Sequence, residues 1–149
     1  MSALPPELAD PVEQLRAKLL EINGSEQTCM TNVVASAPQG KSFPQVQAVM
    51  ARCRQASAAA AATTIDTFRH ECSEIAAHTQ SMAKAAIVSA TAKSILDFWA
   101  KSESCAAAFA SEVAARLPAQ GPDKTTHAIK NICGNRASSI NRYFEQLTT

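Results

Sequence analysis

The spacing of apolar residues along this chain is helical almost from end to end. Asp10 and Pro11 have the N-cap and first-turn chemistry that begins a helix. Asn23 and Gly24 predict the end of this first helix, because glycine accepts the left-handed conformation that follows a helix terminus. A second helix is then expected over residues 25–37. The apolar face of the first helix repeats every three to four residues, at Val12, Leu15, Leu19 and Ile22.

The longest uninterrupted pattern runs from Gln45 to Leu117, seventy-three residues without Gly or Pro. As one straight helix this run would span about 110 Å, whereas a domain of this size has a radius of gyration near about 15 Å. The run must therefore turn. The expected breaks are the polar clusters at 78–81 and 101–104, whose Ser and Thr can cap a following helix, with Thr63-Thr64 as a weaker candidate.

Two loops and a last helix complete the expected architecture. Pro38–Lys41 and Pro118–Pro122 are rich in helix breakers and predict loops, and Ser42 begins a capping pattern for the helix between them. The last helix is expected over residues 123–147, with Gly134 as a candidate kink. No strand pattern competes. The sequence therefore predicts an all-α, single-domain bundle over residues 1–149, with six or seven alanine-rich amphipathic helices and a flexible segment at 1–9.

Alanine composition changes what holds such a bundle together. Thirty of the 149 residues are Ala, and aromatic residues make up only 5%. Alanine favours helices but buries little apolar area, so the core gains less at about 25 cal/mol per Å². Covalent cross-links would compensate, and each of the five cysteines lies on an apolar helix face. Two disulfides plus one free or intermolecular thiol are expected, with five reduced, buried thiols as the alternative, among Cys29, Cys53, Cys72, Cys105 and Cys133.

Cysteine content and charge bear on the compartment and on partners. Widely spaced cysteines in a small chain favour a secreted protein, here a mature chain with an added initiator Met, with a cytoplasmic protein as the alternative. Residues 1–10 lack the apolar region of a signal peptide, and no segment is apolar enough to span a membrane. Asn23-Gly24-Ser25 makes Asn23 a candidate glycosylation acceptor. With a net charge of +1 and no basic block, nucleic-acid binding is not expected.

Motifs for catalysis, cofactors and metals are missing from the sequence. It contains no G-x-S-x-G, no Gly-rich phosphate loop and no H-E-x-x-H, so we expect neither an enzyme nor a cofactor. His70, Glu74 and His78 share one helix face, but the two histidines are about 12 Å apart along the axis. We therefore expect a solvated face there and no metal site.

The few large apolar side chains suggest a function. Among so many alanines, they can leave space between helices for an apolar ligand. We expect a small secreted protein that sequesters or carries an apolar small molecule or lipid. The alternatives are that these side chains simply form the core, and that the chain is a structural or interaction module forming helical dimers linked through the odd cysteine. The expected ligand-lining residues are Met50, Phe68, Met82, Trp99, Phe109 and Phe144.

Overall fold

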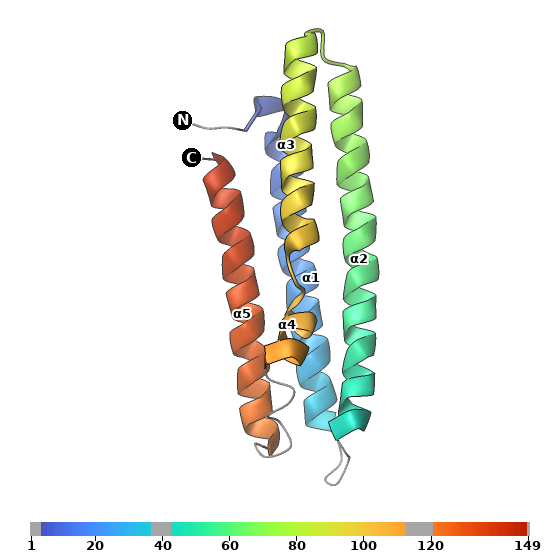
Figure 1. The fold of residues 1–149 in the computed structure, drawn as a ribbon, viewed down its shortest axis with the longest axis vertical. Coiled ribbons are helices and arrows are strands. Elements are labelled where there is room, and N and C mark those ends of the chain that lie inside the picture. Colours follow the sequence, from blue (N-terminus) through green and yellow to red (C-terminus); the bar gives the residue numbers. More distant parts are fainter. Residues whose placement is uncertain (1–3, 37–42, 113–120, 149) are drawn as a thin grey trace.

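The chain forms an elongated helical bundle. The computed structural model describes residues 4–36, 43–112 and 121–148, and this part of the chain contains helices and no strand. Neighbouring long helices run antiparallel, and both chain ends lie at the same end of the bundle (Figure 1). Short α4 follows α3 in the same column. The elements are η1 (Pro6–Leu8), α1 (Ala9–Ser36), α2 (Phe43–Ala77), α3 (Met82–Lys101), α4 (Cys105–Glu112) and α5 (Gly121–Thr148).

The predicted number of six or seven helices is wrong. The described residues hold four long α-helices and the short α4, because two expected breaks do not occur. α1 continues through Gly24, since one glycine costs a helix only about 1 kcal/mol and α1 packs against α2 and α5. α2 continues through Thr63, whose hydroxyl donates to the carbonyl of Ala59 at 3.2 Å and leaves the helix intact.

The two polar clusters do turn the chain, as predicted. Ser81 has an extended backbone, and its hydroxyl oxygen accepts the Lys84 N–H at 3.3 Å, which caps α3. Ser104 caps α4 in the same way, accepting the Ala107 N–H at 3.2 Å. The predicted loop at 38–41 and most of the one at 118–122 lie outside the described residues. The last helix is close to its predicted bounds and continues through Gly134.

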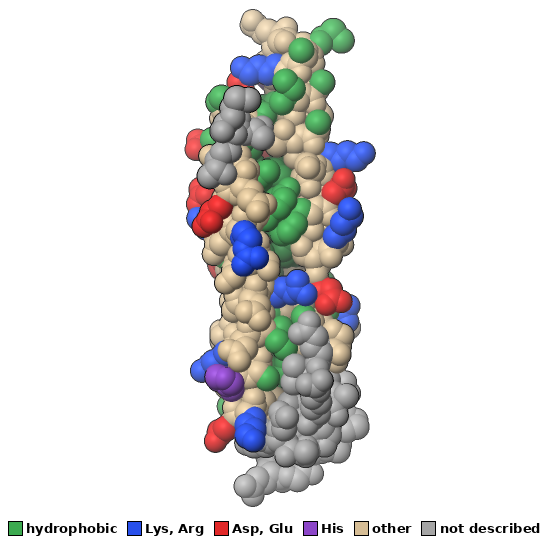
Figure 2. Space-filling model, turned by 60° about the vertical axis from the view of Figure 1, so that its left-hand side comes forward, with side chains coloured by type: hydrophobic (Ala, Val, Ile, Leu, Met, Phe, Trp, Pro, Cys, Tyr) green, Lys and Arg blue, Asp and Glu red, His purple; other side chains and the backbone are tan. Residues whose placement is uncertain are grey.

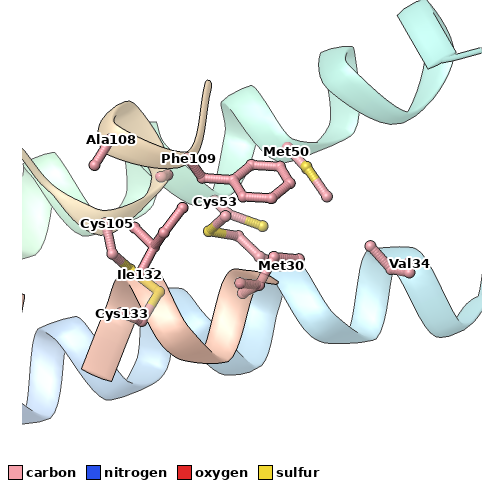
Figure 3. Close-up of a cluster of buried hydrophobic side chains, with 11 residues drawn as sticks. Met30, Val34, Met50, Cys53, Cys105, Ala108, Phe109, Ile132 and Cys133 are labelled. Carbon is pink, nitrogen blue, oxygen red and sulfur yellow. A yellow bond between two sulfur atoms is a disulfide. The ribbon is translucent and has the colours of Figure 1, made fainter. Parts of the chain in front are cut away.

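Buried apolar side chains form two separate clusters along the bundle axis. The upper cluster, near the chain ends, contains Leu8, Val12, Leu15, Leu19, Phe68, Cys72, Val88, Ala92, Ile95, Ile140 and Phe144. The lower cluster, shown in Figure 3, contains Met30, Val34, Met50, Cys53, Cys105, Ala106, Ala108, Phe109, Ile129, Ile132 and Cys133. Leu8 is fully buried in the upper cluster, so η1 contacts the bundle through this side chain, and residues 1–3 of the segment predicted to be flexible lie outside the described residues.

Two disulfides stabilise the lower half, which confirms the predicted pattern of two bonds and one odd thiol. Cys29 of α1 is bonded to Cys53 of α2, with 5.7 Å between their Cα atoms. Cys105 of α4 is bonded to Cys133 of α5, with 4.9 Å between their Cα atoms. Cys72 is free and buried in the upper cluster. Both cross-links therefore lie at the end of the bundle away from the chain termini.

Removing either disulfide should destabilise the fold. We expect Cys105→Ala with Cys133→Ala to lower the free energy of unfolding by about 2–4 kcal/mol, because the unfolded chain regains the freedom of a closed loop. Urea unfolding followed by circular dichroism measures this change. Cys72→Ala, which loses a buried thiol but no cross-link, is the matched control. Equal stabilities of the double variant and this control would contradict the expected role of the bond.

Candidate functional site

A cavity of about 510 Å³ lies between the upper and lower clusters. It sits where the column of α3 ends and α4 begins, at residues 102–104, so that all five α-helices contribute to its wall. Most of the wall is apolar. The apolar residues that line it are Ile22, Ala58, Ala61, Ala62, Ile65, Phe98, Trp99, Ala107 and Ile140.

Small and polar residues at inward-facing positions account for this space. On α1 the buried apolar series runs from Leu19 to Met30 with Glu26 as the buried residue between them. On α2, Ser57 and Ala61 fill the interval between Cys53 and Phe68. Side chains this short cannot reach across a four-helix bundle to restore the density of a packed core. The short or polar residues at inward-facing positions of α1 and α2 therefore create the cavity.

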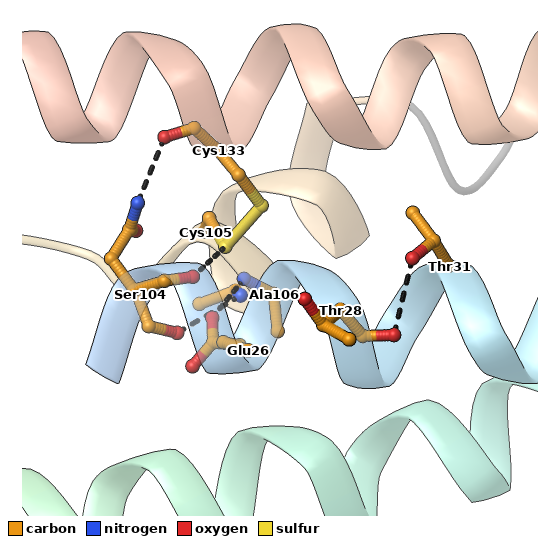
Figure 4. Close-up of a disulfide and its surroundings, with 9 residues drawn as sticks. Glu26, Thr28, Thr31, Ser104, Cys105, Ala106 and Cys133 are labelled. Atoms are coloured by element: carbon orange, nitrogen blue, oxygen red, sulfur yellow. Dashed lines mark hydrogen bonds between the residues drawn. A yellow bond between two sulfur atoms is a disulfide. The ribbon is translucent and has the colours of Figure 1, made fainter. Parts of the chain in front are cut away.

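Glu26 is the most unusual residue of the wall, a carboxylate with only 2% of its surface exposed. Its Oε1 accepts the backbone N–H of Ala106 at 2.5 Å. That amide belongs to the first turn of α4, where a negative charge is favoured by the helix dipole. Its Oε2 has no hydrogen-bond partner among the described residues. Figure 4 shows one carboxylate oxygen at the Ala106 amide and the other on the side that faces α2.

A second cavity, of about 400 Å³, follows the seam between α1 and α2. It shares Ile22, Glu26 and Ser57 with the first cavity, and its remaining wall includes Ala56 and Ala60. The Glu26 carboxyl group thus lies at the boundary of both spaces.

Aromatic side chains close the seam between α3 and α5. The backbones of these two helices lie farther apart than those of α1 and α2 or of α1 and α5. The rings of Phe98 and Tyr143 bridge this wider gap, stacked with 3.7 Å between centroids and 5° between planes. Figure 2 shows apolar side chains at the bottom of a groove between ridges of polar residues. Phe98 and Trp99 continue from this seam into the wall of the larger cavity.

Charged groups stand at the rim of the larger cavity. Arg136 of α5 forms an ion pair with Glu103 at 3.4 Å, and Glu103 is largely exposed. Arg54 of α2 also lines the cavity and is exposed. The site therefore combines an apolar interior, a buried carboxylate and two arginines near solvent.

The six residues predicted to line a ligand site lie in different parts of the structure. Trp99 lines the larger cavity. Phe68 and Phe144 belong to the upper cluster, and Met50 and Phe109 to the lower one, where they fill space and pack against neighbours. Met82, at the start of α3, is 91% exposed. The wall residues that were not predicted are mainly small or polar. The sequence signal for them is Glu26, a glutamate within the apolar series of α1.

Asn23 has a structural contact that is unfavourable for glycosylation. Its side-chain Nδ2 donates to the backbone carbonyl of Cys133 at 3.0 Å, which ties α1 to α5. The residue is half-buried inside a continuous helix. A glycan would need the same nitrogen and would have to displace α5.

The histidine-containing face of α2 is exposed. His70 and His78 approach the Glu74 carboxylate at 3.8 and 3.9 Å, and all three side chains are mostly exposed to solvent. Among the residues with described positions, no group of three or more His, Cys, Asp or Glu could hold a metal ion.

No protein-family model, curated protein or solved structure matches this chain. Within the described segments, no helix has both the length and the apolar character needed to cross a membrane.

The free thiol of Cys72 should make stability depend on pH. Burial, and secondarily the negative charge of Glu71, raise the pKa of Cys72 from 9.0 to about 11. Folding favours the protonated thiol, so this contribution is complete below pH 9 and is lost as the pH rises toward about 11. We expect the free energy of unfolding to fall more steeply over this interval in the wild type than in Cys72→Ala, as measured by urea unfolding under nitrogen. Parallel pH profiles would contradict this assignment.

Proposed function

We propose that this protein binds an apolar small molecule or lipid in the cavity between its helices and shields it from water. The observation that carries the proposal is the cavity of about 510 Å³ with a mainly apolar wall. Ligand sites in proteins are commonly clefts of about 300–1,000 Å³ with such a wall and a few polar groups. Trp99 and Phe98 offer aromatic surface for an apolar body.

The surrounding structure supports a preformed site. The upper and lower clusters pack the bundle on both sides of the cavity, and the two disulfides fix the lower helices to one another. A binding space held by a rigid frame costs less conformational entropy to fill than one that must be ordered by the ligand. Sequestration or carriage is the activity that such a site favours.

We propose further that the chain works in an oxidising compartment, as a secreted protein. Two intramolecular disulfides are typical of secreted small domains and rare in the reducing cytosol. A cytoplasmic location remains the alternative. We propose binding without catalysis, since the wall of the larger cavity is mainly apolar.

A structural or interaction module is the second candidate function. Two large apolar side chains of α3 are exposed, Met82 at 91% and Ile87 at 54% of their surface, and they are the observation that favours it. Side chains of this kind can contribute to a protein interface. A dimer linked through the odd cysteine is disfavoured, because Cys72 is only 4% exposed. Sedimentation velocity on non-reduced protein separates a monomer from either kind of dimer.

Partly filling the cavity should weaken binding of an apolar probe. Diphenylhexatriene is a fluorescent hydrocarbon, and Trp99, the single tryptophan, can transfer energy to it from the cavity wall. We expect Ala61→Leu to weaken binding roughly ten-fold, because the larger side chain takes up ligand space, while the urea unfolding midpoint is kept. A fluorescence titration of each variant with the probe measures the affinity.

The matched control is Ala59→Leu, the same substitution on an exposed position of α2 outside the cavity wall. It should change the affinity by less than about two-fold. Equal effects of both substitutions would place the probe elsewhere, and a wild-type protein that does not bind the probe would rule out the proposed function.

A further inference from the structure

Glu26 is a buried charge that the protein itself leaves incompletely compensated. Two carboxylates, Glu7 and Glu26, have a buried oxygen without a hydrogen-bond partner among the described residues. Glu7 differs, since its other oxygen forms an ion pair with Lys84. In the part of the chain with described positions, Glu26 forms no ion pair, and the nearby Arg136 pairs with Glu103 instead.

The contact with α4 offsets only part of this charge. The N-terminus of a helix carries roughly half a positive charge, and Glu26 accepts one neutral backbone N–H there. Burial of an ionised carboxylate is costly unless a cation or several hydrogen bonds compensate it. Oε2 is the atom that still lacks a donor.

Glu26 is placed beside both cavities, although its Oε2 is covered in the bundle without a ligand. Glu26 lines both cavities, and Ser57, the residue of α2 common to the two walls, is small. Figure 4 shows the oxygen that is not bonded to Ala106 on the side facing α2. The larger cavity extends from here to Phe98 and Trp99. One space therefore joins a buried hydrogen-bond acceptor to an aromatic wall.

We propose that the ligand is an amphipathic amine, whose protonated amino group donates to Glu26 Oε2 while its apolar body lies against the aromatic wall. This inference rests on the proposed function, since it specifies the ligand of the same cavity. An ammonium group supplies both the donor and the positive charge that Glu26 lacks. A hydroxyl supplies only the donor, and a carboxylate is repelled by Glu26, which leaves it the arginines at the rim, Arg54 and Arg136.

Three probes with the same chain and different head groups test the inference. Decylamine, 1-decanol and decanoate are titrated at neutral pH against protein loaded with diphenylhexatriene, and displacement of the dye gives each affinity. We expect decylamine to bind at least about ten-fold more tightly than 1-decanol, as a charge-assisted hydrogen bond in a buried site implies. Decanoate should bind most weakly.

Glu26→Gln tests the residue itself. Glutamine keeps the size of the side chain and an oxygen that can accept the Ala106 N–H, but it has no charge. The ten-fold preference for decylamine over 1-decanol should disappear, while the affinity for diphenylhexatriene stays unchanged. Glu74→Gln is the matched control, because it removes one negative charge at an exposed position outside both cavity walls. It should keep the preference for the amine.

The possible results separate the two levels of the proposal. Dye binding with no preference for decylamine, a preference for decanoate, or a preference that survives Glu26→Gln overturns the amine inference and leaves the cavity function standing. Absence of dye binding by the wild type overturns both. If Glu26→Gln does not fold, the ranking of the three probes on the wild type still decides, because decanoate binding best would assign the head group to the arginines.

Discussion

The hydrogen bond from the Ala106 amide to Glu26 determines how the middle of this bundle is built. It joins the centre of α1 to the first turn of α4, just after the chain leaves α3. The adjacent Cys105 is thereby held against α5, where it is bonded to Cys133. Asn23, one turn earlier on α1, donates to the Cys133 carbonyl. A single polar layer thus links α1, α4 and α5 at one level.

This polar layer divides the hydrophobic core. Above it, aliphatic and aromatic side chains pack without a cross-link, and below it two disulfides lie within a cluster that contains Ala106, Ala108 and several sulfur-containing side chains. The hydrophobic effect scales with buried apolar area, so packed alanine side chains stabilise the fold less than packed leucine side chains. A disulfide therefore compensates for more missing stability in an alanine-rich segment than in a leucine-rich one. The distribution of the cysteines follows this difference, because all four bonded cysteines lie at or below the level of Glu26.

Helix class, the disulfide count and two of the turns could be predicted from the sequence, because local patterns determine them. Ser81 and Ser104 cap helices through neighbours three residues away. Gly24 does not end the first helix as predicted, since tertiary packing along α1 outweighs the local cost of a glycine. Most of the cavity wall does not follow from the positions of the large apolar residues, because space in a helical bundle is created where side chains are short, as at Ser57 and Ala61.

The placement of both disulfides at one end gives the bundle unequal resistance to opening. At the end near the chain termini, helices separate once packing around residues such as Leu8 and Phe144 is lost. At the other end, α1 stays attached to α2 and α4 to α5 even without packing. Local opening should thus start at the end near the chain termini, which has no disulfide, and progress toward the polar layer. A molecule could enter the central cavity by that route while the cross-linked end keeps the helices paired.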